Sequence, residues 1–495
     1  MIKKYSLGDP SVNIRCDPAA EYPVYLFRDR RKEAAYYCSS LAEMLSFLTG
    51  KYPLKIDQSG LSFLLQSGFV PTPSSIFSDL YIVSIGDTIK LETKNSGLSI
   101  SHGFQFPFEG VCGNGGSSYD EEKLLELLAD GVLTKVDSSK ESYIFHSAGK
   151  DSNAIVIALA AAGRQSEFTL VTQKSSGQSD ESAISQKVAK KLGYRSLVLP
   201  EVSELSGGQA YEIERYMAKA PFPCCDPVSL AYPIYAHEFP ELKAANIIDG
   251  MGNDVYLGHI PSKRELLLQN LSGLSTYLQC LRAFVDSSNP LNYVLNTRAE
   301  VTGMSGISYR DTKKLMPGST NVSKHWREVA RKGNRDYIEF RGQTRGVYQD
   351  KEMFTRKVAN FCDVYDSNLI LPWCDQAVVD YAAGLPESIR FDRKNLRNKV
   401  FLRELLLDRL GIDSDALGKK GFMFSHRAIL RKDIAWVEAS ISSCEKWDKK
   451  GVQKVVKKLI IKLDSPIKIV RSRSELMLVR LLLLSLWLKS RSTPT

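Results

Sequence analysis

The stretch from Ser147 to Ser152, with the sequence SAGKDS, combines residue types that proteins use to bind phosphate. It follows a short apolar run at 143–145 and precedes an apolar, helix-forming run at 154–160. A strand that turns through glycine into a helix presents free backbone N–H groups and the positive end of the helix dipole, which together bind anions. Asp151 would repel a phosphate unless a cation lay between them, so the stretch also predicts Mg²⁺. An ordinary strand–turn–helix corner with a polar turn is the alternative interpretation.

A second glycine-containing turn, DGMGNDVYLG at residues 249–258, also follows an apolar run. From 143 to 260 the sequence alternates between strand patterns, such as FTLVTQK and SLVLP, and helix patterns, such as SDESAISQKVAKKLGY. This alternation predicts an α/β fold, with a parallel sheet that carries helices on both faces. Ligands of such sheets bind at the carboxyl ends of the strands, and both turns fall there.

The rest of the chain is expected to frame this α/β unit. Residues 1–108 show short strand patterns and two helical patterns, which predict a small α+β domain. The Gly- and Ser-rich segment 109–120 predicts a linker, and residues 121–495 would form the domain that carries both turns. From residue 265 onward the patterns are mainly helical. The apolar run 476–488 is too short to span a bilayer and predicts a buried C-terminal helix.

The composition is that of a globular protein, with 43% hydrophobic and 25% charged residues in a chain of 495. The N-terminal residues lack a signal-peptide pattern, and the nine cysteines include no C-x-x-C pair. We therefore expect a cytoplasmic protein with reduced thiols and no zinc site. Residues 421–495 contain 16 Lys and Arg against 6 Asp and Glu, which accounts for the whole net charge of +10. Such a tail could attract nucleic acid, an acidic peptide or an anionic membrane, or it could be a solvated helix face.

Several segments together resemble one family of enzymes. SAGKDS resembles the pyrophosphate-binding loop S-G-G-x-D-S of the ATP-pyrophosphatase superfamily, and DGMGND resembles the loop S-G-x-G-x-D of its asparagine-synthetase-like amide ligases. In the same order, residues 56–92 are similar to the end of the family's glutaminase domain. Residues 371–390 are similar to its P-F-L-D segment and the helix after it, and GKKGF at 418–422 is similar to R-x-K-x-G-F. The resemblance implies a synthetase domain with the adenine nucleotide alpha-hydrolase-like fold, preceded by a truncated glutaminase remnant.

The departures from this family bear on function. Glutamine-using members begin with a catalytic cysteine, whereas this sequence has Ile2 and lacks about half of that domain, so we expect no ammonia release from glutamine. The family's Glu or Tyr between the glycines of the second loop is Met251 here, and its Glu before P-F-L-D is Asn368. By the resemblance, both residues belong to the substrate pocket. Similar losses occur in lasso-peptide cyclases, and the chain is also close in character to β-lactam synthetases.

The resemblance assigns ATP and Mg²⁺ to the two loops. Ser147, Gly149 and Ser152 would cradle the pyrophosphate through backbone N–H and hydroxyl groups. Asp151, also in that loop, and Asp254 would be the Mg²⁺ ligands, from loops that face each other across neighbouring strand ends.

Two further roles follow from the resemblance. Gly250 and Gly252 would let the second loop approach the nucleotide where a Cβ would clash. Lys419 would be the catalytic cation that stabilises negative charge during acyl transfer, with Lys420 as the alternative alignment.

The implied reaction is adenylation of a carboxylate, with release of pyrophosphate, followed by attack of an amine and release of AMP. Loss of the Glu pair argues against free aspartate and favours an intramolecular amine. We therefore expect cyclisation in a natural-product pathway, such as lasso-peptide macrolactam formation, with a precursor peptide and a partner protease.

Three alternatives remain open. One is a small-molecule, β-lactam-type or ammonia-dependent asparagine-type synthetase. A second is a catalytically silent scaffold of a biosynthetic complex, which Ala148, Met251 and Asn368 favour. The third is a tRNA-thiolating or lysidine-forming enzyme, supported by the basic tail alone, so nucleic acid is not the expected partner.

Overall fold

The N-terminal part of the chain folds into two antiparallel sheets. The computed structural model describes residues 1–95, 97–110, 119–175, 180–272, 278, 281–282, 284–417 and 424–491. The sheets have the strand orders β1-β4-β3-β5 and β2-β6-β7. Their strands are β1 (Lys3–Tyr5), β2 (Val12–Ile14), β3 (Val24–Asp29), β4 (Ala34–Cys38), β5 (Leu80–Val83), β6 (Asp87–Lys94) and β7 (Gly97–Phe104).

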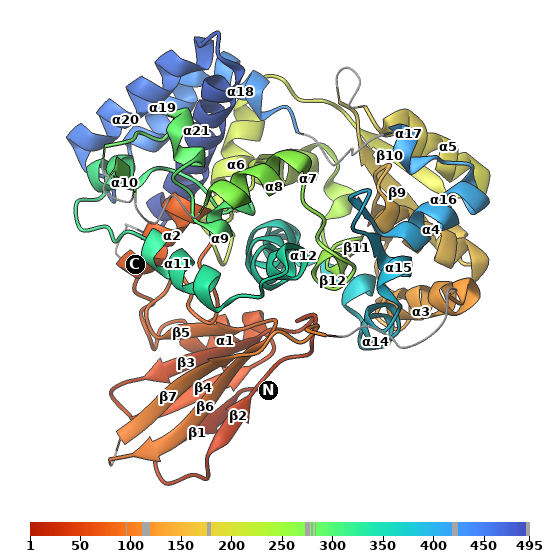
Figure 1. Ribbon diagram of the computed structural model, residues 1–495, viewed down its shortest axis with the longest axis horizontal. Coiled ribbons are helices and arrows are strands. Elements are labelled where there is room, and N and C mark those ends of the chain that lie inside the picture. Colours follow the sequence, from red (N-terminus) through yellow and green to blue (C-terminus); the bar gives the residue numbers. More distant parts are fainter. Residues whose placement is uncertain are drawn as a thin grey trace.

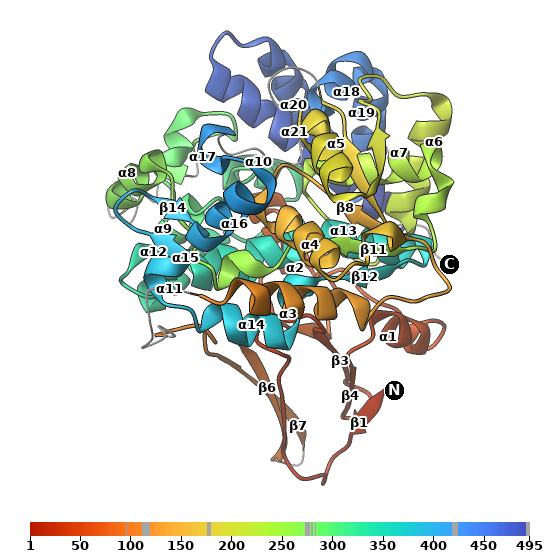
Figure 2. The ribbon, with the colours of Figure 1, turned by 90° about the vertical axis from the view of Figure 1, so that its right-hand side faces the viewer.

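The two sheets face each other across a small apolar core, to which every strand contributes (Figure 2). The buried residues of this core are Tyr5, Ile14, Leu26, Ala35, Val83, Ile89, Leu91 and Leu98. Two helices accompany the sheets, α1 (Leu41–Leu48) and α2 (Gln58–Ser67). Strands β3, β4, β5 and β6 and both helices lie in segments whose patterns predict them, whereas the sequence patterns did not predict β1, β2 and β7.

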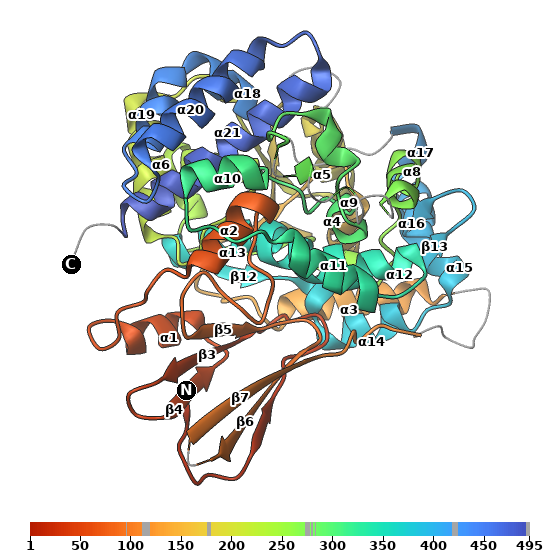
Figure 3. The same cartoon turned by 60° about the vertical axis from the view of Figure 1, so that its left-hand side comes forward.

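Helix α2 joins this N-terminal part to segments from the second half of the chain (Figure 3). The carbonyl of Leu65 accepts hydrogen bonds from the Ile307 N–H at 2.9 Å and from Arg480 Nη1 at 3.2 Å. The Trp326 indole N–H donates to Ser67 Oγ at 2.8 Å. The two regions therefore share one packed interface.

The central element of the structure is a five-stranded parallel sheet with the order β10-β9-β8-β11-β12. Its strands are β8 (Ser142–Phe145), β9 (Phe168–Gln173), β10 (Arg195–Leu199), β11 (Asn246–Asp249) and β12 (Asn368–Ile370). All four neighbouring pairs are parallel. The predicted α/β class with a parallel sheet is confirmed.

Helices cover both faces of this sheet, α4 and α5 on one side and α6 and α7 on the other (Figure 1). Their bounds are α4 (Lys150–Ala161), α5 (Ser182–Leu192), α6 (Gly207–Lys219) and α7 (Ala231–Glu238). The ring of Phe145 packs against Tyr232 of α7 and against Phe361 of α13 (Arg356–Tyr365). Because both faces are buried, the strands consist of apolar runs.

Strand β12 and the hairpin of β13 (Phe391–Asp392) and β14 (Arg397–Asn398) interrupt a region in which the sequence predicts mainly helices. These strands are two or three residues long, too short to give a periodic pattern. In the segment predicted as a linker, residues 111–118 lie outside the described residues. Helix α3 (Glu121–Leu133) begins directly after it, where Asp120 Oδ1 accepts from the Lys123 N–H.

The remaining described residues are mainly helical. Besides the π-helix η9 (Gly342–Thr355), these helices are α8 (Lys263–Leu271), α9 (Arg298–Val301), α10 (Tyr309–Leu315), α11 (Ser323–Lys332), α12 (Tyr337–Arg341), α14 (Gln376–Ala383), α15 (Glu387–Arg390), α16 (Val400–Leu410), α17 (Ser414–Leu417), α18 (His426–Lys432), α19 (Ile434–Ser442), α20 (Lys449–Ile461) and α21 (Lys468–Lys489). The predicted buried C-terminal helix is α21, in which residues 477–488 are buried. In the part of the chain that the structure describes, no helix has the length and apolar character needed to cross a membrane.

Candidate functional site

The loop between β8 and α4 gathers the predicted phosphate-binding residues at the carboxyl end of the sheet. The Ser147 N–H donates to Ser152 Oγ at 3.3 Å, and the Gly149 N–H donates to Ser147 Oγ at 3.1 Å. Gly149 is the N-cap of α4 and, as a glycine, has no side chain with which to cap the helix. The positive end of the α4 dipole therefore faces the site, and the Ala148 N–H just before the cap donates to Glu181 Oε2 at 2.9 Å.

The loop after β11 presses directly against the first loop. A Cβ on Gly250 would come within 3.0 Å of the Ser152 backbone nitrogen. Gly252 has a φ of +110°, and a Cβ there would come within 2.3 Å of Cys374 Sγ. The structure thus gives Gly250 a role in packing the two loops together and Gly252 a role in packing the second loop against Cys374, whereas the resemblance assigns both glycines to the approach of the nucleotide.

The side chain of Lys399 joins the two loops. Its Nζ lies 2.7 Å from Asp151 Oδ2, 2.7 Å from Asp254 Oδ1 and 2.8 Å from Asn253 Oδ1. Burial alone would lower the pKa of Lys399, but the carboxylates of Asp151 and Asp254 outweigh it and raise the pKa well above its usual value. Lys399 is therefore an ammonium, and only 2% of the residue is exposed.

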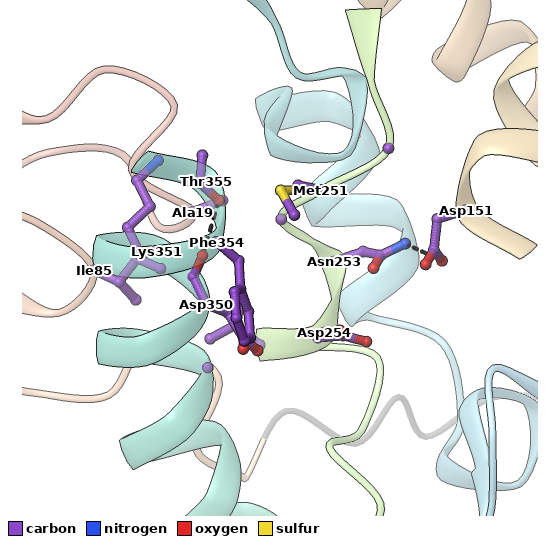
Figure 4. A pocket seen from close by; sticks show the side chains of 14 residues that line it. Ala19, Ile85, Asp151, Met251, Asn253, Asp254, Asp350, Lys351, Phe354 and Thr355 are labelled. Carbon is purple, nitrogen blue, oxygen red and sulfur yellow. Dashed lines mark hydrogen bonds between the residues drawn. The ribbon is translucent and has the colours of Figure 1, made fainter. Parts of the chain in front are cut away.

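The acidic pair is further held by its neighbours. Asn253 Nδ2 donates to Asp151 Oδ1 at 2.7 Å (Figure 4), and the Trp373 indole N–H donates to the Asp151 carbonyl at 3.2 Å. The side chains of Asp151 and Asp254 remain 28% and 44% exposed. Two carboxylates from different loops thus converge on one cationic atom and stay open to solvent. This oxygen-only donor set fits the hard cation Mg²⁺.

Lys399 is a site residue that the sequence does not reveal. It lies 248 positions from Asp151 in the chain and immediately before α16. Its backbone is left-handed, with a φ of +52°, which turns the chain from the β13–β14 hairpin into the helix. The sequence shows only that Lys399 is one of several basic residues in the segment RKNLRNKV. That pattern does not distinguish a site residue from a solvated surface charge.

A cavity of about 160 Å³ opens beside the second loop. The second loop supplies Met251 and Asp254, and the π-helix η9 supplies Asp350 and Phe354 (Figure 4). The N-terminal part supplies two apolar side chains, those of Ala19 and Ile85. Met251, predicted as a substrate-pocket residue, thus lines a cavity next to the acidic pair. Long π-helices are rare and are often associated with functional sites.

Asn368, the other predicted pocket residue, lies elsewhere. It begins β12 and pairs with Asn246 at the amino end of the sheet. Its Nδ2 donates to the Lys135 carbonyl at 2.8 Å and to Asn246 Oδ1 at 3.0 Å. The assignment of Asn368 to the pocket is therefore wrong, because the loops of the site are at the opposite, carboxyl end of the strands. The side-chain amide of Asn368 instead links β12 to β11 and to the segment after α3 through hydrogen bonds.

Lys419 and Lys420 lie outside the described residues, as does the whole segment 418–423.

The described part of the site can receive an anion at α4, hold a hard cation on two carboxylates and admit a small molecule into the adjoining cavity. No family model matches the sequence, and no curated protein was found to match it.

Proposed function

We propose that this protein is an ATP-dependent ligase that forms an amide bond through an acyl-adenylate. The observation that carries the proposal is the convergence of Asp151 and Asp254 on the Lys399 ammonium, beside the N-terminus of α4. Anion-binding and cation-binding groups then lie side by side, as a metal–polyphosphate complex requires. The resemblance of both loops to those of asparagine-synthetase-like ligases supports the same conclusion.

Each loop has a distinct part in the proposed reaction. Backbone N–H groups at 147–152 would bind the phosphates that leave as pyrophosphate when a carboxylate oxygen attacks the α-phosphorus of ATP. Asp151 and Asp254 would hold Mg²⁺, which neutralises charge on the phosphates when bound. Lys399, displaced from the carboxylates, would remain close enough to form an ion pair with a phosphate oxygen. An amine then attacks the acyl carbon, and AMP leaves.

The size of the cavity bears on the substrate. A volume of about 160 Å³ accommodates a group the size of an amino acid. A peptide would therefore insert its reacting end, and the rest of it would lie outside. Peptide macrolactam formation, with a precursor peptide and a protease as partners, remains the preferred form of the proposal, and a small-molecule synthetase is the alternative.

A catalytically silent scaffold is the second candidate function. Lys399 Nζ lies between the two carboxylates, where the ligase proposal puts the metal ion, and Glu181 Oε2 accepts the Ala148 N–H of the first loop at 2.9 Å. These contacts place a resident cation and a resident anion at positions that Mg²⁺-ATP would use. A scaffold would keep both contacts permanently, whereas a ligase exchanges the first for the metal.

Calorimetric titration with ATP, with and without Mg²⁺, tests the proposal and separates the two candidates. The wild type should bind ATP in the presence of Mg²⁺, and Asp151→Asn or Asp254→Asn should weaken that binding by at least about tenfold, the usual effect of removing a charged ligand. Asp130→Asn, at an exposed position of α3, is the matched control and should bind like the wild type. Absence of binding to the wild type would refute the ligase and favour the scaffold.

A further inference from the structure

The cavity beside the second loop has walls that are apolar in one part and acidic in another. Most of the described residues around it are small or apolar: Ala19, Ile85, Gly250, Met251, Gly252, Val255, Gly346 and Phe354. Its charged residues are Asp151, Asp254, Asp350 and Lys351. Asp151 and Asp254 are engaged by Lys399, which leaves Asp350 as the acidic group that the proposed nucleotide site does not use.

Asp350 is held in a fixed orientation by a histidine behind it. Its Oδ2 lies 2.7 Å from His259 Nε2, and His259 Nδ1 lies 3.1 Å from Arg341 Nη2. A guanidinium can only donate, so His259 Nδ1 is the acceptor and Nε2 carries the proton that it donates to Asp350. Burial lowers the pKa of His259, which keeps the ring neutral. Asp350 is thus a carboxylate that accepts a hydrogen bond through Oδ2.

This hydrogen-bonding pattern argues against a metal ion at the same place. Ligand atoms of Asp254, His259 and Asp350 lie within 4.8 Å of one another, a spacing that could hold a metal. The protonated Nε2 of His259 cannot coordinate one, and its tautomer is set by Arg341. The carboxylate of Asp350 is therefore available to a ligand that donates hydrogen bonds.

The cation in the cavity wall is directed elsewhere. Lys351 Nζ donates to the carbonyl of Ala20, and Figure 4 shows its side chain extending away from the carboxylate of Asp350. Arg345 Nε forms an ion pair with Asp350 Oδ1 at 3.7 Å, but this separation is longer than a hydrogen bond. Neither cation closes the Asp350 carboxylate off with a hydrogen bond.

We propose that this cavity is a binding site for a primary amine. The ammonium or amine head would donate to Asp350 Oδ1, and a short aliphatic chain would contact Met251 and Phe354. This inference rests on the proposed function, for which it supplies the subsite of the nucleophile, whether that primary amine belongs to the reacting end of a peptide or to a small molecule. It concerns binding alone and would hold in the absence of nucleotide.

Saturation-transfer NMR with three probes of matched size tests the proposal: n-butylamine, 1-butanol and butyrate. The wild type should bind n-butylamine, and 1-butanol should bind at least about tenfold more weakly because it carries no charge for Asp350. Butyrate should not bind, since its charge repeats that of the wall. Equal binding of all three probes, or preference for butyrate, would overturn the proposal.

Two variants locate the binding. Asp350→Asn should weaken n-butylamine by at least about tenfold by removing the charge, and Met251→Trp should abolish binding by filling the cavity without changing any charge. Asp130→Asn is the control and should leave binding unchanged. If Asp350→Asn fails to fold, Met251→Trp alone decides the matter. Butylamine binding that survives a folded Asp350→Asn or Met251→Trp would place the amine elsewhere and overturn the proposal.

The outcome is independent of the test of the proposed function. Mg²⁺-ATP binding without amine binding would remove this inference and keep the ligase. Amine binding without Mg²⁺-ATP binding would keep the cavity as an amine site and remove its role as a nucleophile subsite.

Discussion

Replacing Lys399 with methionine should destabilise the fold and make its stability depend on Mg²⁺. Methionine has nearly the length of lysine, so the main loss is the Nζ ammonium itself. With it go the ion pairs to Asp151 and Asp254 and the hydrogen bond to Asn253. Breaking a fully buried ion pair costs about 3–5 kcal/mol. Here the two carboxylates are 28% and 44% exposed and recover part of their hydration, so we expect the free energy of unfolding to fall by about 2–3 kcal/mol.

Urea denaturation followed by circular dichroism measures this loss, with Lys187→Met on the exposed face of α5 as the control. Asp151→Asn should reduce the cost of Lys399→Met, because the double variant leaves a single unpaired carboxylate. Millimolar Mg²⁺ should restore stability to Lys399→Met by more than it stabilises the wild type. A loss below about 0.5 kcal/mol, the scale of ordinary surface changes, would refute this reasoning, as would equal effects of Mg²⁺ on both proteins.

Three further predictions concern the end of strand β11, the second loop and the segment GKKGF. Burial raises the pKa of Asp249 to about 6, so its contribution to stability is largest below the unfolded pKa near 4 and is lost as the pH rises through 6. Asp249→Asn should therefore be more stable relative to the wild type at pH 7 than at pH 4, by about 1–2 kcal/mol in the free energy of unfolding. Thermal denaturation of both proteins at the two pH values measures this difference. Gly252→Ala should lower the melting temperature and weaken Mg²⁺-ATP binding, since its Cβ would collide with Cys374 Sγ, and a melting temperature equal to that of the wild type would contradict the loop geometry. Lys419→Ala should slow amide formation by about 100-fold with little change in ATP affinity, and Lys420→Ala is its control; a larger effect at Lys420 would shift the alignment of GKKGF by one residue.

The elements that frame the site are predictable because their signals are local. An apolar run, a glycine-containing turn and a second apolar run specify β8, the loop 146–149 and α4 within about 20 residues, and the same applies to β11 and its loop. A parallel sheet then places both loops at one edge. These steps place Asp151 and Asp254 at the same edge of the sheet, whereas the adjacency of β8 and β11, which brings the two residues together, is implied by the resemblance and not by the local patterns.

The rest of the site depends on contacts between distant segments, for which a single sequence carries no signal. Lys399 reaches Asp151 from 248 positions away, and His259 orients Asp350 from 91 positions away. Strand β12 is three residues long, so its register could not be predicted, and the resemblance that assigns Asn368 to the substrate pocket does not reveal its place at the amino end of the sheet. The same limitation applies to the contacts of Gly250 with Ser152 and of Gly252 with Cys374, which the sequence does not reveal, and the role of these glycines in nucleotide approach stays a prediction.

A crystal structure with Mg²⁺ and α,β-methylene-ATP, an analogue that cannot be cleaved at the α-phosphorus, tests the central claim most directly. We predict that the phosphates will bind along the backbone N–H groups of residues 147–152 and that Mg²⁺ will contact Asp151 and Asp254. Lys399 Nζ should then have left at least one of these carboxylates for a phosphate oxygen. A nucleotide bound at another place, or one bound here while Lys399 keeps both carboxylates and no metal reaches them, would contradict the account.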